Sequence, residues 1–309
     1  MTDVSIIYVN YHTSDLIADS MRSVYKFTEG VNYEIIVVDN ATEPHLRDKF
    51  SSLFPGKELK FIFLKENVGF GRANNAGARE AQSRYVFYLN PDTVLVNNAI
   101  KILMDYMDSH SDVGAAGGNL YDDYMGPMLS FRRFIPGVEW EINELMHHIP
   151  ERMRYGKNIR FNFSDNPLEV GYISGADLMV RSEIEKKLGG FSKEFFMYYE
   201  ETDYCARIRN LGYKVINVPL AKIMHLEGGS FENADVNETR MVRSETSRFV
   251  YYRRNVSPFK FKVCNTLYIA FLRSRVLLTR SEGYKIRLRI FKSLLEKYKN
   301  KFSDHENTI

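Results

Sequence analysis

The sequence contains little cysteine and no long uncharged apolar run. Cys205 and Cys264 are the only cysteines in 309 residues, which excludes a disulfide scaffold or a cysteine-rich metal site and favours a reducing compartment. The best candidate for a membrane span, Val263–Leu272, lies between Lys262 and Arg273. It is far shorter than the roughly 20 residues that cross a bilayer. The first residues lack a basic segment and an apolar core, so we expect no secretory signal.

The chain has no strong net charge, but its charges are unevenly distributed. Hydrophobic residues make up 44% and charged residues 26%, which excludes general disorder and allows one large or two small domains. Residues 1–250 contain 28 Lys and Arg against 35 Asp and Glu, a net charge of −7. Residues 251–301 contain 14 Lys and Arg against two Glu, a net charge of +12. The basic segment indicates an anionic partner, such as nucleic acid or a membrane surface.

Strand and helix patterns alternate through the first 120 residues. Val4–Val9 and Tyr33–Val38 are nearly continuous apolar runs, typical of strands buried on both faces of a parallel sheet. The alternation predicts an α/β fold with a mostly parallel, Rossmann-like sheet flanked by helices, and consecutive helices follow from about residue 237. Further strands are expected at 59–64, 85–89, 113–120 and 213–218, and helices at 15–27, 45–54, 73–82, 97–109 and 199–211.

Polar segments follow the predicted strands, where open α/β sheets bind ligands. Asp39 follows the second strand; its carboxylate can accept hydrogen bonds from a ribose or base, or it can cap the next helix. The loop with Gly69 and Gly71 lacks the third glycine of the dinucleotide fingerprint and follows the wrong strand, which disfavours a nicotinamide dehydrogenase. This loop can bring backbone close to a diphosphate, with Arg72 supplying charge, or it can be a plain turn.

Two positions have the chemistry of metal ligands. Asp92 lies on a turn stiffened by Pro91, where a lone carboxylate can hold Mg²⁺ together with waters and phosphates, or can cap a helix. His225 follows the predicted strand Val215–Val218 and precedes a glycine-rich stretch. We interpret it as a metal ligand or as an ordinary structural histidine.

A cluster of carboxylates follows an aromatic run. Glu200, Glu201 and Asp203 fall within four residues, and their mutual repulsion is costly unless a cation or a proton-transfer role uses them. A helix N-terminus would lower that cost, so one of the three can be a plain first-turn residue.

Seven stretches in a fixed order resemble the family 2 glycosyltransferases with the GT-A fold, in particular the rhamnosyltransferase-like and galactofuranosyltransferase-like branch. They are VSIIYVNYH, IIVVDNA, ENVGFGRANNAG, YVFYLNPDTVL, YISGADLMVRSE, GGFSKEFFMYYEETDYCARIRNLGYKV and IMHLEGGS, within residues 4–230. The resemblance implies a GT-A catalytic domain over 1–236, with a nucleotide-sugar half at about 1–120 and an acceptor half at about 121–236. A basic helical region would follow at 237–309.

The resemblance also implies roles for single residues. Glu201 matches the catalytic base, which is more often Asp in the family, and Glu200 and Asp203 would support it. The donor nucleotide-sugar would be held by Val9, Tyr11 and Asp39 at the base and ribose, by Asn67, Gly69 and Arg72 near the diphosphate, and by Asn90, Gly175 and Asp177 nearer the metal and sugar.

The metal motif departs from the family pattern. Asp92 matches the last Asp of the D-x-D motif, whose first Asp is replaced by Asn90, and His225 matches a further metal ligand of some members. Mg²⁺ or Mn²⁺ would stabilise the leaving diphosphate while the base deprotonates the acceptor hydroxyl, in an inverting single displacement. Branch resemblance favours dTDP-rhamnose as donor, with a UDP-sugar as the alternative. It implies a surface glycan, free or lipid-linked, as acceptor.

The basic tail predicts an amphipathic cationic helix, suited to an anionic membrane surface. We expect a cytoplasmic protein that contacts the inner face of the cell membrane through residues 251–301. The alternatives are packing on the catalytic domain or on a second subunit of a homodimer. Nucleic acid is disfavoured because every motif lies in the acidic part. The helix pattern rests on Tyr284, Leu288, Phe291, Leu295 and Tyr298.

Two other classes of protein remain as alternatives. A nucleotidyltransferase would need a basic, glycine-rich loop after the first strand, where this sequence has NYHTSD. A non-catalytic nucleotide-sugar-binding scaffold would leave the carboxylate cluster and His225 unexplained.

Overall fold

The structure is a computed structural model that describes residues 2–40, 43–226 and 238–306, with side chains up to residue 298. By their contacts, the residues form two units. Of the described residues, the first unit contains 2–135, 155–196 and 200–226, and the second contains 136–154, 197–199 and 238–306. The division therefore differs from a single boundary at residue 237, because two internal segments pack with the C-terminal helices.

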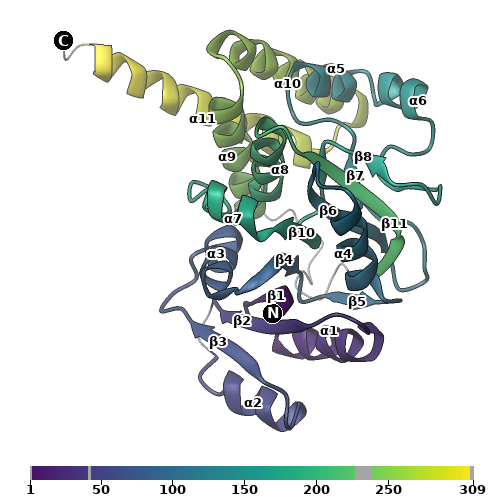
Figure 1. Cartoon of the computed structure of the whole chain (residues 1–309). Coiled ribbons are helices and arrows are strands. Elements are labelled where there is room, and N and C mark those ends of the chain that lie inside the picture. Colours follow the sequence, from purple (N-terminus) through teal and green to yellow (C-terminus); the bar gives the residue numbers. More distant parts are fainter. Residues whose placement is uncertain (1, 41–42, 227–237, 307–309) are drawn as a thin grey trace. The chain divides into compact units, whose positions relative to one another are not determined.

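The first unit is built on a nine-stranded sheet (Figure 1). Its order is β3-β2-β1-β4-β10-β6-β11-β5, with β8 beside β11. Strands β1, β2, β3, β4, β6 and β11 run in one direction, and β10, β5 and β8 run against them. The strands are β1 (Thr2–Asn10), β2 (Tyr33–Asp39), β3 (Leu59–Phe63), β4 (Ser83–Leu89), β5 (Thr93–Leu95), β6 (Val113–Tyr121), β8 (Leu168–Glu169), β10 (Asp177–Arg181) and β11 (Lys214–His225).

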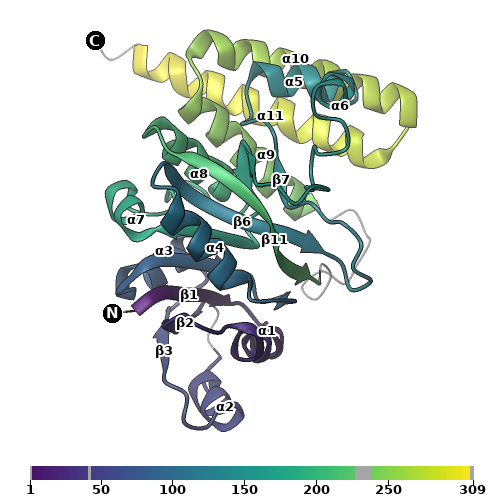
Figure 2. The same ribbon diagram turned by 45° about the vertical axis from the view of Figure 1, so that its right-hand side comes forward.

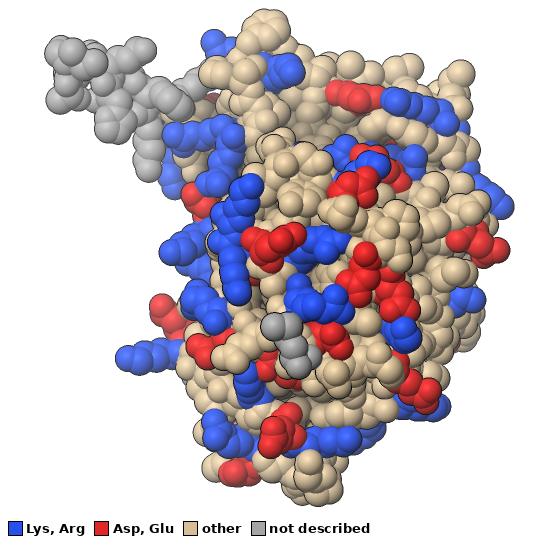
Figure 3. Space-filling view, in the orientation of Figure 1, with Lys and Arg blue, Asp and Glu red and all other residues tan. Residues whose placement is uncertain are grey.

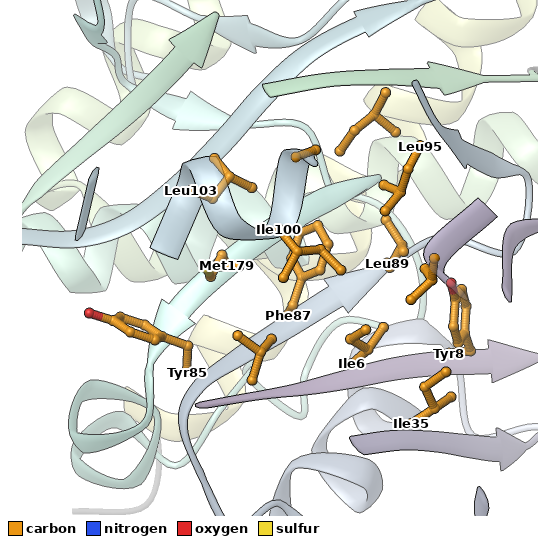
Figure 4. Packing of buried hydrophobic residues seen from close by; sticks show 14 of the residues in the cluster. Ile6, Tyr8, Ile35, Tyr85, Phe87, Leu89, Leu95, Ile100, Leu103 and Met179 are labelled. Carbon is orange, nitrogen blue, oxygen red and sulfur yellow. The ribbon is translucent and has the colours of Figure 1, made fainter. Parts of the chain in front are cut away.

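Helices cover both faces of this sheet. Alternate residues of β1 point to opposite faces: Val4, Ile6 and Tyr8 join one buried cluster, and Ile7 and Val9 join the other. Figure 4 shows part of the first cluster, in which side chains of several strands pack together beneath α4. Helices α1 (Ser14–Phe27), α2 (Leu46–Leu53) and α4 (Ala99–Ser109) cover the first face, and α3 (Phe70–Glu80), α7 (Ser182–Leu188) and α8 (Glu200–Asn210) the second.

The predicted α/β class and its mostly parallel sheet are confirmed. Two features differ from the expectation. The antiparallel strand β10 lies in the middle of the sheet, between β4 and β6. Strand β11 continues to His225 instead of ending at Val218, so His225 belongs to a strand and not to a loop. The glycine-rich stretch that follows it lies outside the described residues. A small second sheet pairs β7 (Phe131–Arg132) with β9 (Tyr172–Ile173).

The second unit is helical, and Figure 2 shows its long helices side by side. Its core is formed by Phe249, Tyr268, Leu272 and Phe291. The apolar stripe predicted to face a membrane packs against this core instead, since its members Tyr284, Leu288, Leu295 and Tyr298 all contact it. The helices are α5 (Val138–Leu145), α6 (Ile149–Tyr155, whose last residue belongs to the first unit), α9 (Glu238–Asn255), α10 (Pro258–Thr279) and α11 (Glu282–Glu306).

Within residues 2–226 and 238–306, none of the helices combines the length and the apolar character that crossing a bilayer requires.

Candidate active site

Most of the predicted site residues lie at or near one edge of the sheet. Strands β1 and β2 end side by side, with Asn10 paired to Asp39. Strand β4 ends at Leu89, opposite Asp177, where the antiparallel strand β10 begins. Strand β11 ends at His225, paired with the first residue of β5. The carboxyl ends of the strands therefore meet at this edge, as the general rule for α/β proteins predicts.

The Asp39 carboxylate is buried and partnered at this edge. Its Oδ1 accepts a hydrogen bond from Nδ2 of Asn10 at 3.1 Å, and its Oδ2 accepts one from the backbone N–H of Glu43 at 2.7 Å. Asp39 thus organises the turn after β2. It does not cap the next helix, the alternative that the sequence left open, because α2 begins at Leu46 with His45 at its N-cap. Val9 is buried in β1, whereas Tyr11 beyond it is half exposed and offers an aromatic face at the edge.

The Gly69 loop is more than a plain turn, because its glycines allow close packing. Gly69 has a φ of +89°, and a Cβ there would lie 2.2 Å from the carbonyl oxygen of Phe196. The backbone N–H of Phe70 donates to the same oxygen at 3.0 Å. A Cβ on Gly71 would lie 2.9 Å from Cβ of Phe191. Only glycine lets this loop lie against the segment that leads to the acidic cluster.

Two other predicted donor-site residues belong to the same loop. The Asn67 Oδ1 accepts hydrogen bonds from Nδ2 of Asn40 at 3.0 Å and from the backbone N–H of Gly69 at 2.9 Å. The exposed Arg72 donates from Nε to the carbonyl oxygen of Lys193 at 2.8 Å. Asn67 therefore shapes the loop from inside, and Arg72 braces it against the segment before the acidic cluster.

Asp92 and His225 are brought together. Oδ1 of Asp92 lies 3.3 Å from Nε2 of His225, and both side chains are only slightly exposed. The backbone N–H of Leu226 donates to the carbonyl oxygen of Asp92 at 2.8 Å, which fixes the pair. In the part of the chain that the structure describes, no cluster of three or more His, Cys, Asp or Glu is arranged as a metal site. A carboxylate and an imidazole still fit a divalent cation that completes its shell with water and phosphate oxygens.

A hydrogen bond joins the turn that carries Asp92 to the segment that carries Gly175. The backbone N–H of Asn90 donates to the carbonyl oxygen of Ala176 at 2.9 Å, and the carbonyl oxygen of Asn90 accepts from Oγ1 of Thr93 at 2.7 Å. Asn90 thus holds the turn through its backbone.

Glu201 faces Gly175 across a space with room for a methyl group. A Cβ on Gly175 would lie 3.7 Å from Cβ and Cγ of Glu201 and 3.9 Å from Cε1 of Phe70. Oε1 of Glu201 accepts a hydrogen bond from Oγ1 of Thr202 at 3.1 Å. The side chain is partly exposed, and the desolvation of its buried part raises the pKa of the Glu201 carboxyl above its ordinary value. A partly exposed carboxylate with a raised pKa is suited to accept a proton.

The other two carboxylates of the cluster are buried. Asp203 Oδ2 pairs with Nε of Arg207 at 2.8 Å and accepts from Oγ of Ser192 at 2.6 Å. Arg207 also donates to the carbonyl oxygen of Gly190 at 2.6 Å. Asp203 therefore ties the loop before the cluster to α8, and Glu200 lies buried in the first turn of that helix.

Asp177 lies in the interior, at the start of β10. It is fully buried, and its Oδ2 accepts a hydrogen bond from the backbone N–H of Gly118 at 2.6 Å. Burial raises the pKa of Asp177 well above its ordinary value, which favours the neutral acid. The structure thus gives this residue a role inside the sheet, whereas the sequence analysis had expected it beside the donor sugar.

Sequence reasoning missed two asparagines and a strained pair. Asn10 holds Asp39, and Oδ1 of Asn40 accepts from the backbone N–H of Val68 at 2.9 Å. Asn10 is the last residue of β1, and Asn40 directly follows β2. Their positions at the ends of apolar strands were visible in the sequence. Tyr198 and Tyr199 have φ values of 73° and 67°. The aromatic sequence around them does not predict a left-handed backbone.

Comparisons with known proteins identify one family for the chain. A family model described as Glycosyl transferase family 2 matches residues 5–184. The low-salt glycan biosynthesis hexosyltransferase Agl10 of Haloferax volcanii is 26% identical over 263 residues, 81% of this chain and 73% of its own length. The dTDP-rhamnosyl transferase RfbF of Shigella flexneri is 25% identical over 204 residues, and this chain spans 61% of it. The match to RfbF covers 64% of this chain.

A third relative is the N-acetylglucosaminyl-diphospho-decaprenol L-rhamnosyltransferase of Mycobacterium tuberculosis, 24% identical over 242 residues, with 73% of this chain and 76% of that protein covered. Among solved structures, GalNAc-T7 with UDP, GalNAc and Mn²⁺ matches with a TM-score of 0.64 at 17% identity, over 98% of this chain and 58% of that one. The Pyrobaculum calidifontis mannosyltransferase PcManGT with GDP-Man and Mn²⁺ matches with a TM-score of 0.56 at 15% identity, over 94% and 84%. These likenesses confirm the GT-A fold.

Proposed function

Because the chain belongs to glycosyl transferase family 2 and is a hexosyltransferase, we propose that it transfers its sugar by an inverting, metal-dependent displacement at the described sheet edge. One observation carries the proposal. The hydrogen bond from Asn90 to Ala176 joins the turn of the Asp92–His225 pair to the segment in which Gly175 faces Glu201. The pair that would hold the cation and the residue that would accept the proton are thus linked at the same edge of the sheet.

Asp92 and His225 would hold Mg²⁺ or Mn²⁺, and the two solved neighbours were both obtained with Mn²⁺. When bound, such an ion neutralises the donor diphosphate and stabilises the charge that develops as it leaves. Asn90 keeps the turn in place through its backbone, so that the single carboxylate of this motif stays beside the histidine.

Glu201 acts as the general base. It removes the proton of the acceptor hydroxyl while the hydroxyl oxygen forms a bond to the anomeric carbon. The bond from that carbon to the diphosphate breaks on the opposite side, so the configuration inverts. Gly175 leaves the space in front of Glu201 open to the sugar. Asp203 and Glu200 support the base from inside: Asp203 pairs with Arg207, and Glu200 lies in the first turn of α8.

The nucleotide lies across the ends of β1 and β2 in this proposal. The half-exposed Tyr11 offers a ring for the base, and Val9 and Asp39 shape the strand ends behind it. The backbone around Gly69, held by Asn67, and the guanidinium of Arg72 would face the diphosphate. Asp177 is buried in the sheet, so it would not touch the donor. It would only help to hold the neighbouring segment that carries Gly175 in place.

The donor we favour is dTDP-rhamnose, and the acceptor a cell-surface glycan on a lipid carrier. The names of the Shigella and mycobacterial relatives support both choices. A UDP-sugar is the alternative donor, since the structural neighbour GalNAc-T7 was solved with UDP. A panel of dTDP-rhamnose, UDP-sugars and GDP-mannose, tested with Mn²⁺ for release of the nucleoside diphosphate, would identify the donor.

We further propose a cytoplasmic location and a peripheral contact with anionic membrane through the C-terminal region. Lys and Arg gather over the region where α9 and α11 are drawn (Figure 3). Since the α11 stripe packs on the core of its own unit, the apolar contact would come from α10, on which Phe259, Leu277 and Leu278 are each more than two-thirds exposed. Apolar side chains beside cations are typical of interfacial helices.

Vesicle flotation tests this contact. The chain should float with phosphatidylglycerol vesicles and not with phosphatidylcholine vesicles, and a Leu277→Glu/Leu278→Glu variant should lose the binding. Leu53→Glu, at an exposed apolar position of the first unit, is the matched control. If light scattering shows instead that the double variant breaks up a dimer, this surface joins two copies of the chain.

Substitution of Glu201 tests the catalytic proposal. Glu201→Gln should lower turnover by at least about a hundredfold, because a positioned base contributes on the order of 10²–10⁴ to the rate. Donor binding, measured by titration calorimetry, should be retained. Glu183→Gln, at an exposed position of α7, is the control. Near-full turnover by Glu201→Gln would refute the assignment of the base.

A further inference from the structure

Helix α9 of the second unit holds the three residues that directly precede the acidic cluster. Oγ of Ser247 donates a hydrogen bond to the carbonyl oxygen of Met197 at 2.8 Å. The rings of Tyr251 and Tyr199 are in contact, with centroids 5.5 Å apart. By its contacts, segment 197–199 belongs with the C-terminal helices, although the chain on both sides of it belongs to the first unit. The two contacts come from adjacent turns of α9, four residues apart.

The held segment has an unfavourable backbone conformation. Tyr198 and Tyr199 both lie in the left-handed region, which bulky residues with a Cβ adopt only when their surroundings impose it. Neither is a glycine, so the chain would relax toward other conformations if α9 released it. Ser247 and Tyr251 restrain this segment from α9, and the guanidinium of Arg240, on the same helix, lies 5.9 Å from the centroid of the Tyr198 ring.

Helix α9 is itself firmly anchored within its unit. Between its two contacts lies Arg248, which is buried and pairs with Glu141 of α5 at 2.7 Å. The Arg248 guanidinium also lies 3.6 Å from the centroid of the Tyr268 ring, on α10. A buried, paired and stacked guanidinium holds a helix in one position, because leaving it unpaired would cost its desolvation without compensation. The contacts to Met197 and Tyr199 are therefore made by a helix that is itself held in one position.

The covalent chain carries this restraint to the proposed base. Glu200 follows Tyr199 directly, and Glu201 is the next residue, in the first turn of α8. We propose that Ser247 and Tyr251 are positioning residues for Glu201. On this view, the basic C-terminal unit sets the geometry of proton transfer and is not only an anchor. This inference rests on the proposed function, in which Glu201 is the base.

The test compares matched serine variants on α9. Ser247→Ala should lower kcat by about tenfold to a hundredfold, since a misplacement of about 1 Å can cost on the order of a hundredfold, with donor KM and donor affinity unchanged. Ser247→Thr keeps the hydroxyl and should recover most of kcat. The control is Ser244→Ala, one turn earlier on α9, where the described residues provide no hydrogen-bond partner. Tyr251→Leu should act like Ser247→Ala, and combining the two should add little.

The probe is release of nucleoside diphosphate from dTDP-rhamnose, or from the panel donor that the wild-type chain turns over. A kcat loss confined to Ser247→Ala and Tyr251→Leu, and rescued by Thr, supports the inference. Unchanged kcat in both variants overturns it, as does a loss that Thr fails to rescue or that Ser244→Ala shares. If Glu201→Gln itself keeps its turnover, the proposed function fails first, and the two failures are thereby distinguished.

Discussion

Nε2 of His225, at the end of β11, lies 3.3 Å from Oδ1 of Asp92, on the turn after β4. The pairing of β11 with β5 through His225 and Thr93 brings these distant parts of the chain together. Their proximity is a tertiary feature that a bound cation would use.

Substitutions of this pair should change the metal requirement. Asp92→Asn and His225→Asn should each raise the Mn²⁺ concentration for half-maximal activity by at least about tenfold, because each removes one of the two proposed protein ligands. Metal titration of activity, with donor binding followed in parallel, measures this. His110→Asn, before β6 at the opposite end of the sheet, is the control. Unchanged metal dependence in both variants would locate the cation elsewhere.

Gly175→Ala should fold normally and transfer sugar poorly. Gly175 does not need a left-handed backbone, and a Cβ there meets only ordinary contacts, so we expect a stability change within about 0.5 kcal/mol. The methyl group would occupy the space in front of Glu201 and lower kcat/KM. Thermal unfolding and steady-state kinetics separate these effects. Full activity would show that substrate does not enter this space.

Gly117→Ala is the contrasting variant. A Cβ on Gly117 would lie 2.3 Å from Cγ2 of Ile173 and 2.8 Å from the carbonyl oxygen of Asp177. Overpacking of this kind costs about 1–3 kcal/mol, so this variant should unfold at a lower temperature. If both glycine variants lose stability equally, the distinction between a packing glycine and a substrate glycine is wrong.

Asp177→Asn should become more stable than wild type as the pH rises. The folded chain holds a proton on Asp177, because burial raises its pKa well above the ordinary value of 3.8. The unfolded chain releases that proton from about pH 4 upward, so wild-type stability falls with rising pH. The neutral Asn lacks this loss. Urea unfolding from pH 4 to pH 8 measures the difference, with Asp123→Asn, at an exposed position, as control; a pH-independent difference would contradict the buried neutral acid.

Arg248→Met should destabilise the helical unit strongly. It leaves the buried carboxylate of Glu141 without its 2.7 Å partner, and breaking a buried pair on one side costs about 3–5 kcal/mol. The double variant Glu141→Leu/Arg248→Met should recover much of this. Arg154→Met removes an exposed pair with Glu139 and should cost less than about 1 kcal/mol. Thermal unfolding checks all three, and equal losses from the buried and the exposed pair would refute the role of burial.

Several parts of the site could be predicted because their signals are local. Val4–Val9 and Tyr33–Val38 read as buried strands and are β1 and β2. The crowding of the three carboxylates marked the acidic cluster, and the family resemblance pointed to Glu201 within it. Glu201 lies in the first turn of α8. In a sheet of this type the carboxyl ends of the parallel strands lie at one edge, so the location of the site could be predicted once the strands were assigned.

Other parts could not be predicted, because burial and proximity depend on what packs around a residue. The α11 stripe has the same spacing whether it faces lipid or another helix, and it packs on the α9–α10 core. Asp203 and Glu201 are chemically alike and two residues apart, yet one is buried against Arg207 and the other faces Gly175.

The sequence by itself determined the α/β class, the strand ends, and the set of residues that can carry chemistry, because apolar periodicity and turn residues act over a few neighbours. Only the tertiary structure decided which of those residues meet. It paired Asp92 with His225, left Glu201 in front of Gly175, and gave Ser247 a place beside the chain that leads into the acidic cluster. These are contacts between distant segments, which form only when the whole sheet and the helices around it close.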